Sequence, residues 1–151
     1  MMDCKAMTMP MASNLKLLSD SSSYSVDSTM YHQMIGSFMY LTNTRPDICF
    51  VVNTLSQYLT DPRSVHLTAT NHIPRYLKGT IDYGLKYDAN QKINLEGYVD
   101  SDWADSAINR KSTSGCYFSM GSGVISWFSR KQSYVVVSIA EVEYVATCSA
   151  S

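Results

Sequence analysis

The spacing of apolar residues changes from a helical period to an alternating one near residue 83, and this change limits the fold more than any other feature. Upstream, apolar residues recur every three or four positions, as on one helix face: Tyr31, Met34, Ile35, Phe38 and Met39. Downstream, the stretches YGLKYD, LEGYVDSDW, TSGCYFSM and VISWFS alternate, which predicts successive strands. The sequence therefore predicts an α+β chain with a helical N-terminal half followed by a sheet.

Residues 31–80 predict three helices separated by breaks that contain proline. The first break, TNTRPD, places Pro46 at a favourable first helical position, with Asp47 beside the positive end of the helix dipole. The third apolar stripe contains Pro74, which removes a backbone donor and clashes with the preceding turn. Either the helix bends there or the sequence has accumulated damage, and we favour damage.

The remaining segments predict a hairpin, a terminal helix and a linker. MGSG at 120–123 is typical of a tight turn between two strands. Ser138, followed three residues later by Glu141, predicts a capping box at the start of the helix SIAEVEYVATCSA. Residues 1–30 are rich in Met and Ser with little periodicity, which predicts a linker-like, poorly ordered segment.

Composition excludes several classes of protein. The 151 residues are 45% hydrophobic with a net charge of -1, which argues against a protein that grips nucleic acid over its whole surface. No run approaches ~20 apolar residues, so we expect no membrane partner. Four cysteines without a CxxC pair and three separated histidines predict no zinc site. We interpret the histidines as surface or boundary residues and expect reduced thiols in the cytoplasm.

Two carboxylates have the placement expected of metal ligands. Asp100 lies near the end of a predicted strand and Glu143 on the terminal helix, so the pair could hold hard divalent cations such as Mg²⁺. Isolated acids in such places are more often solvated surface groups. Asp102 could be an outer ligand of the same metal ion or the cap of the segment that follows it. Glu141 already has a structural role in the predicted capping box. Glu143 is left without a structural role.

The motifs themselves resemble the Pol polyprotein of copia-type long-terminal-repeat retrotransposons. The resemblance is carried by YHQMIGSFMYLTNTRPDICFVVNTLSQYLTDP, RYLKGT, GYVDSDWADSAINRKSTSGCYFSMGSGVISWFSRKQ and AEVEYVAT, in order along nearly the whole chain. It implies that residues 31–90 form the tail of the reverse transcriptase region and its connection. It also implies that residues 91–151 form the start of a ribonuclease H domain, an incomplete mixed sheet with a C-terminal helix.

The resemblance also implies a site and its chemistry. Asp100 matches the first catalytic aspartate and Glu143 the catalytic glutamate of a two-metal Mg²⁺ site that cleaves RNA in an RNA–DNA hybrid. The next catalytic aspartate falls after Ser151, so we expect weak Mg²⁺ binding and no activity of this chain alone. The implied partners are the RNA–DNA hybrid and the remainder of the polyprotein. An open sheet edge would favour self-association.

The adjacent basic pairs are candidates for nucleic-acid contact. Arg110 and Lys111, and likewise Arg130 and Lys131, lie in regions that the resemblance places near the hybrid, although solvated charges at strand ends are an equal alternative. The two tryptophans, Trp103 and Trp127, could stack on bases but are more often core residues in alternating strands.

Departures from the family pattern keep other interpretations open. They are Asp105 in place of a glycine, Asn109 in place of an aspartate, Ile139 in place of a threonine, and Pro74 in place of an apolar residue. Together they suggest a sequence that is no longer held to catalysis. The alternatives are a non-catalytic remnant that binds nucleic acid or protein, and an open reading frame with no selected role.

Overall fold

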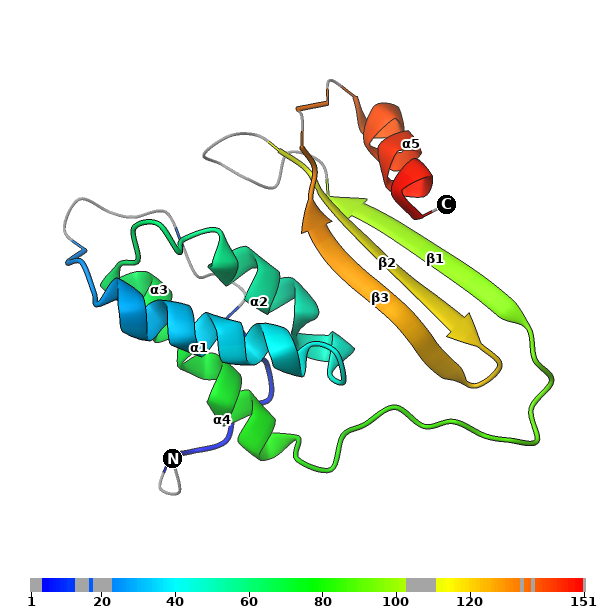
Figure 1. The fold of residues 1–151 in the computed structure, drawn as a ribbon, viewed down its shortest axis with the longest axis horizontal. Coiled ribbons are helices and arrows are strands. Elements are labelled where there is room, and N and C mark those ends of the chain that lie inside the picture. Colours follow the sequence, from blue (N-terminus) through cyan, green and yellow to red (C-terminus); the bar gives the residue numbers. More distant parts are fainter. Residues whose placement is uncertain are drawn as a thin grey trace. The chain divides into compact units, whose positions relative to one another are not determined.

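The computed structural model describes residues 4–12, 17, 23–102, 111–133, 135–136 and 138–150. The chain forms two compact units, Met1–Gly84 (unit 1) and Leu85–Ser151 (unit 2) (Figure 1). Unit 1 is helical, and unit 2 contains an antiparallel sheet and a helix. These elements confirm the predicted α+β class. No helix within the described residues is both long and apolar enough to cross a membrane.

Unit 1 consists of short helices whose ends follow local chain chemistry. Its elements are α1 (Ser28–Leu41), the 3-10 helix η1 (Pro46–Ile48), α2 (Cys49–Ser56), α3 (Ser64–Thr70) and α4 (His72–Gly79). Helix α1 begins before the apolar stripe because the Asp27 side chain accepts hydrogen bonds from the backbone N–H groups of Thr29 (2.8 Å) and Met30 (3.4 Å). Pro46 starts η1, as predicted.

The core of unit 1 brings together all of these helices. Its buried residues are Tyr31, Ile35, Ile48, Val51, Val52, Leu55, Ala69, Ile73 and Tyr76. The hydroxyl of Tyr31 donates to the carbonyl of Leu55 (2.9 Å), so the polar atom of this buried ring is satisfied. Met39, which we expected on the buried face of α1, is exposed.

Pro74 occupies the first turn of a helix, which removes the reason for treating it as damage. Helix α3 ends at Thr70, Asn71 caps it, and α4 begins at His72, so Pro74 is the third residue of α4. The first backbone N–H groups of a helix have no intrahelical acceptor, and proline is therefore tolerated there. The chain bends before the proline, so the structure shows the first of our two alternatives at this position, a bend in the helix.

The described part of the N-terminal segment lies along α4. The backbone N–H of Met7 donates to the carbonyl of Arg75 (3.2 Å), and Arg75 Nε donates to the carbonyl of Lys5 (3.0 Å). Lys78 Nζ donates to the carbonyl of Cys4 (2.9 Å). Residues 4–12 therefore make defined contacts, although the sequence suggested a linker; residues 1–3, 13–16 and 18–22 lie outside the described residues.

His66 is buried in unit 1, contrary to the interpretation of all histidines as surface or boundary residues. Its Nδ1 accepts from the backbone N–H of Arg63 (3.0 Å) and its Nε2 lies 2.9 Å from the carbonyl of Leu17. The first bond requires an unprotonated Nδ1, so Nε2 carries the proton and donates. The ring stacks on Tyr58 at 3.8 Å between centroids. Burial lowers the pKa of His66, and the Leu17 carbonyl offsets part of this effect.

We expect unit 1 to lose stability on mild acidification because of His66. An unfolded histidine titrates near ~6.5. With a lower pKa in the folded state, the unfolded chain takes up the proton first, so the free energy of unfolding falls as the pH drops below that value. Urea unfolding between pH 7.5 and 5 measures this. His66→Phe should flatten the dependence of the free energy of unfolding on pH. The variant His32→Gln, at an exposed site, should leave this dependence unchanged. An unchanged dependence in His66→Phe would show that His66 is not its source.

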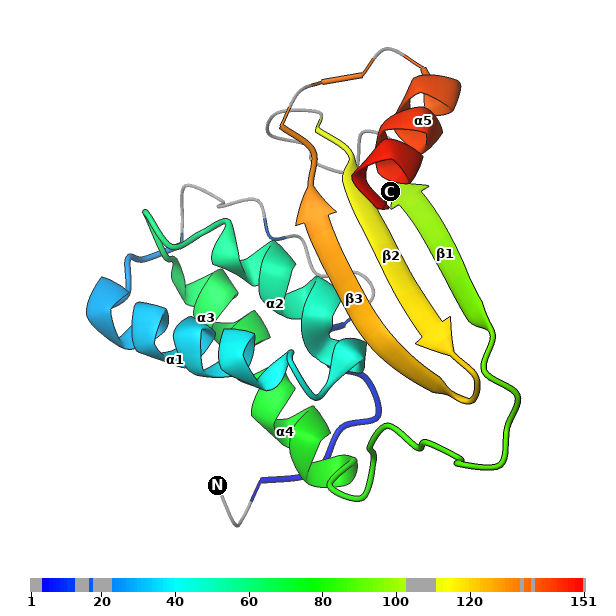
Figure 2. The ribbon, with the colours of Figure 1, turned by 45° about the vertical axis from the view of Figure 1, so that its right-hand side comes forward.

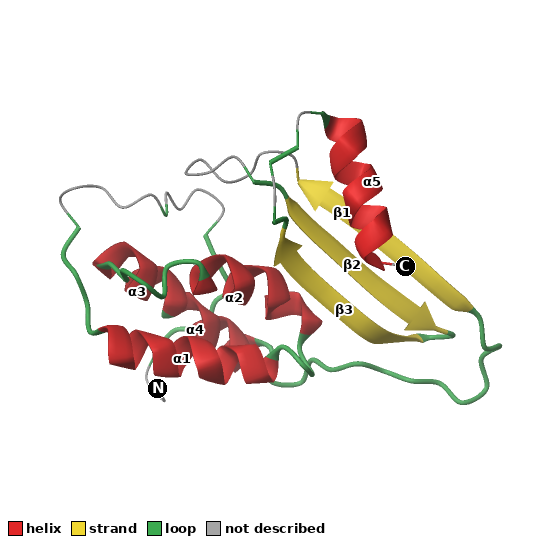
Figure 3. Cartoon of the chain, turned by 45° about the horizontal axis from the view of Figure 1, so that its top comes forward, coloured by secondary structure: helices red, strands yellow, loops and turns green. Residues whose placement is uncertain are grey.

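Unit 2 is a three-stranded sheet with one helix. Its elements are β1 (Leu95–Asp102), β2 (Thr113–Met120), β3 (Gly123–Lys131) and α5 (Ile139–Ala150). The described strands run antiparallel in the order β1-β2-β3 (Figure 3). The sheet is therefore not the mixed sheet that we expected, because short connections between sequential strands force antiparallel neighbours. Gly121 adopts a positive φ of 63° in the predicted β2–β3 turn.

Two further predictions for unit 2 had different outcomes. The stretch YGLKYD is not a strand: Tyr87 donates its hydroxyl to the carbonyl of Val124 (2.7 Å), and the Asp88 N–H donates to Ser122 Oγ (2.7 Å). These contacts attach the stretch to the hairpin without a ladder of backbone bonds. At the start of α5, the Glu141 N–H donates to Ser138 Oγ (3.3 Å), which confirms the serine half of the capping box.

Candidate functional site

Asp100 lies on the sheet face opposite to α5. It pairs with Gly115 of β2, and its exposed carboxylate accepts from the backbone N–H of Ser101 (2.9 Å). The neighbouring Ser114 faces α5, because it lines a pocket with residues of that helix. Side chains alternate along a strand, so Asp100 points away from the face that Ser114 occupies.

Glu143 lies on the flank of α5. The helix buries Val142 and Ala146 and leaves Glu143 exposed. Helix α5 packs against β1 and β2 (Figure 2), so the elements that carry Glu143 and Asp100 are neighbours. Their side chains nevertheless belong to different sides of the sheet. Among the residues that the structure describes, no group of three or more His, Cys, Asp or Glu side chains could hold a metal ion. The two-metal site therefore stays a prediction.

The structure brings three of the four predicted basic residues to one place, the C-terminal end of β3. Arg130 and Lys131 line a pocket there, and Lys111 Nζ donates to the carbonyl of Ser133 on its rim. The Arg130 guanidinium lies 5.7 Å from the centre of the Phe128 ring, within the range of a cation–π contact. Arg110 lies outside the described residues.

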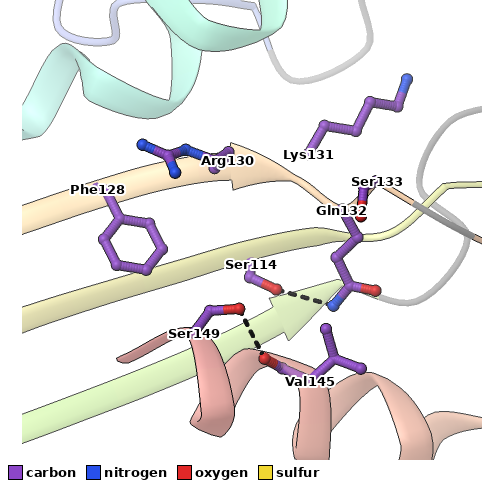
Figure 4. A pocket seen from close by; sticks show the side chains of 8 residues that line it. All are labelled: Ser114, Phe128, Arg130, Lys131, Gln132, Ser133, Val145 and Ser149. Carbon is purple, nitrogen blue, oxygen red and sulfur yellow. Dashed lines mark hydrogen bonds between the residues drawn. The ribbon is translucent and has the colours of Figure 1, made fainter. Parts of the chain in front are cut away.

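The pocket lies between the end of β3 and the last turns of α5 (Figure 4). We call it the Gln132 pocket. Its cavity has a volume of about 330 Å³. The sheet and the segment after it contribute Ser114, Phe128, Arg130, Lys131, Gln132 and Ser133. Val145 and Ser149 line it from α5. The pocket thus combines basic groups, hydroxyl groups and an apolar wall.

Gln132 connects the sheet to α5 and carries an unpaired acceptor. Its side chain is 7% exposed, and Nε2 donates to Ser114 Oγ (2.8 Å) and more weakly to the carbonyl of Val142 (3.4 Å). Its Oε1 has no hydrogen-bond partner within the described structure. A buried acceptor without a donor costs about 1–3 kcal/mol. Sequence analysis missed Gln132 because a single polar residue after a strand has no distinguishing pattern.

Three aromatic residues of the sheet, Tyr98, Tyr117 and Trp127, lie on the face that also carries Asp100. Tyr98 and Tyr117 are opposite one another and stack, with centroids 4.7 Å apart and ring planes 13° apart. Trp127 is opposite Tyr117 on the next strand and is half-buried. Trp103 lies outside the described residues. Because Trp127 is half-buried, its ring could serve either predicted role, packing in the core or stacking on a base.

Sequence comparison places the chain among proteins of retrotransposons. The Pol polyproteins from transposons RE1 and RE2 of Arabidopsis thaliana are 40% and 38% identical over the whole chain, which covers 10% of each polyprotein. The secreted RxLR effector protein 161 of Plasmopara viticola is 41% identical over 80% of this chain, which covers 86% of that protein. No family model matches the chain. No solved structure matches it either.

The chain belongs to the retrovirus-related Pol polyproteins of copia-type transposons. It spans about a tenth of the length of the Pol polyproteins that it matches. This relation confirms the resemblance carried by its motifs.

Proposed function

We propose that unit 1 is the end of a reverse transcriptase region with its connection, and that unit 2 is the first part of a ribonuclease H domain. In the parent polyprotein the two units would act on an RNA–DNA hybrid. The observation that carries this proposal is the relation to Pol polyproteins along the entire chain. The order of elements in unit 2 supports it, since one acid lies on the first strand and another on the helix after the third.

The described residues do not by themselves assemble a two-metal site. Mg²⁺ prefers several oxygen ligands around one point, whereas Asp100 and Glu143 belong to opposite sides of the sheet and have no third acidic, histidine or cysteine neighbour within the described residues. We therefore propose that they become ligands only in the parent polyprotein, together with groups from elsewhere in it.

The proposal is tested with a longer Pol segment that contains these 151 residues. Cleavage of a labelled RNA–DNA hybrid in Mg²⁺ should fall at least about a hundredfold in Asp100→Asn and in Glu143→Gln, since each metal ligand supports several kcal/mol of charge stabilisation. The matched variant Glu96→Gln changes an exposed acid of the same strand and should retain activity. Equal activity of all three variants would refute the assignment.

The purified 151-residue chain itself should show no Mg²⁺-dependent cleavage of the same hybrid. The reason is the absence of a metal-binding cluster among its described residues. A known ribonuclease H serves as positive control for the substrate. Cleavage by this chain that disappears in Asp100→Asn and persists in Asp82→Asn would overturn the prediction.

A non-catalytic nucleic-acid-binding module is the second candidate function. The observation that favours it is the meeting of Lys111, Arg130 and Lys131 at the Gln132 pocket, because cations at one place can neutralise backbone phosphates without any hydrolytic group. Binding of a hybrid by the longer Pol segment without cleavage would favour this candidate over the first.

A further inference from the structure

Residues 87–94, which we call the strap, are attached to the β2–β3 hairpin at both of their ends. At the start of the strap, the hydroxyl of Tyr87 and the backbone N–H of Asp88 donate to hairpin oxygens, each at 2.7 Å. At its end, just before β1 begins, the carbonyl of Asn94 accepts from the backbone N–H of Gly121 (3.0 Å). The strap therefore has a defined place in unit 2, although it is neither helix nor strand.

The Tyr87 ring occupies the space that a side chain at position 123 would need. Gly123 is buried at the start of β3, and a Cβ added there would overlap the ring of Tyr87, with Cγ of the ring 3.1 Å from the added atom. The backbone of Gly123 does not adopt a positive φ, so other residue types could follow the same backbone path. Glycine is therefore needed at this position to admit the ring, and not to make the turn.

The attached strap leaves only a short piece of chain between the two units. On the side of unit 1, the N–H of Tyr83 donates to the carbonyl of Thr80 (3.0 Å) in a turn that follows α4. Residues 84–86 then separate this turn from the start of the strap. Three extended residues span about 10 Å, whereas the eleven residues 84–94 would span about 38 Å if the strap left the hairpin.

We propose that the strap is a conformational device that sets the length of the tether between the two units, and that the Tyr87 ring on Gly123 holds it closed. The tether consists of residues 84–86 when the strap is closed and of residues 84–94 when it is open. Opening breaks only contacts at the end of the hairpin, and the Tyr87 side chain is 58% exposed, so the rest of the sheet can stay folded. The strap does not depend on the proposed function, because all of its contacts lie in unit 2. Its consequence for a bound hybrid, a wider range of positions for unit 2 when the strap is open, does rest on that function.

The test measures the rate at which trypsin cleaves after Lys92, inside the strap, in the full 151-residue chain. A protease needs an extended segment, so cleavage at this position reports the population of the open strap. Tyr87→Ala removes the ring and its hydroxyl, and Gly123→Ala adds the methyl group that the ring excludes. The matched controls are Tyr40→Ala, at a tyrosine of α1 that is 81% exposed, and Gly84→Ala, where an added Cβ meets nothing within 4 Å.

We expect cleavage after Lys92 to be at least about tenfold faster in Tyr87→Ala and in Gly123→Ala than in the wild-type chain, and to change less than about twofold in the controls. Tyr87→Phe keeps the ring and loses only the hydrogen bond, so it should accelerate cleavage by about two- to tenfold. Gly123→Ala should add nothing in the Tyr87→Ala background, because the methyl group then has no ring to displace. The ¹⁵N signals of β1 and β2 should keep their positions, which shows that the sheet remains folded.

Small-angle X-ray scattering of the same variants measures the separation of the two units. The root-mean-square length of a flexible tether grows with the square root of its length, from about 10 Å for three residues to about 18 Å for eleven. The maximum dimension should therefore rise in Tyr87→Ala and Gly123→Ala and stay the same in the controls. The proposal is overturned by an unchanged cleavage rate in Tyr87→Ala, by additive effects in the double variant, or by an unchanged dimension when the strap is open.

The strap and the ribonuclease H assignment can fail separately, because neither readout of the strap involves a nucleic acid or a metal ion. The expected trypsin rates, together with no hybrid cleavage by the longer Pol segment, would refute only the ribonuclease H assignment. Hybrid cleavage that depends on Asp100, together with trypsin rates that are equal in Tyr87→Ala and the wild-type chain, would refute only the strap.

Discussion

Replacing Asp47, whose side chain is 31% exposed, with alanine should lower the free energy of unfolding of unit 1 by about 1–2 kcal/mol, because solvent screens part of its charge. The Asp47 carboxylate accepts from Arg45 Nε (2.9 Å), Arg45 Nη2 (2.7 Å) and the Tyr76 hydroxyl (2.8 Å). The Arg45 side chain is 11% exposed and also donates to the carbonyl and hydroxyl of Thr80. Without Asp47, a nearly buried guanidinium keeps its charge and loses its counter-ion.

The exposed pair of Arg63 and Asp61 provides the control. The two residues have the same spacing in sequence, but Arg63 Nε and Nη2 both donate to one oxygen of Asp61, and the side chains are 34% and 61% exposed. Asp61→Ala should therefore cost less than about 1 kcal/mol in urea unfolding followed by circular dichroism. If Asp47→Ala and Asp61→Ala lower the free energy of unfolding by the same amount, the hydrogen bonds of Asp47 do not stabilise unit 1 more than an exposed ion pair does.

Acid should reduce the difference between wild type and Asp47→Ala. Burial alone would raise the pKa of Asp47, but the hydrogen bonds from Arg45 and Tyr76 outweigh it and lower the pKa. The carboxylate therefore stabilises the fold above the unfolded value of about 3.9, and this contribution is lost as the pH falls through the lower folded value. The two chains should be closer in stability at pH 3 than at pH 7.

Ile73→Ala should destabilise unit 1 by about 2–5 kcal/mol, because Ile73 is completely buried between the helices of the core. Ile81 is 79% exposed in the same unit, and Ile81→Ala removes the same atoms from a site without packing. It should change the free energy of unfolding by less than about 0.5 kcal/mol. A similar loss in both variants would mean that the packing around Ile73 is not as described.

The regular elements could be predicted from the sequence, because they follow from local rules. The spacing of Tyr31, Ile35 and Phe38 predicted α1, and the glycine-containing turn at 120–123 predicted the β2–β3 hairpin. The bend before Pro74 was harder to predict, since residues 65–77 continue the apolar period through Asn71.

The site was less predictable, because its geometry depends on non-local contacts. Sequence reasoning found Lys111, Arg130 and Lys131 by their charge. Gln132 acquires its role only when α5 places the carbonyl of Val142 next to its amide. The side of the sheet that Asp100 occupies likewise follows from pairing with β2, which no local pattern in β1 specifies.

The register in which β1 pairs with β2 decides which face of the sheet the Asp100 side chain occupies. Asp100 now pairs with Gly115, and the side chains of a strand exchange faces when its register moves by one residue. Such a slip would turn Asp100 to the side that carries Glu143 and would separate the stacked rings of Tyr98 and Tyr117. The tyrosine stack therefore opposes the slip, and removal of the stack would lower the cost of a register in which Asp100 and Glu143 lie on the same side of the sheet.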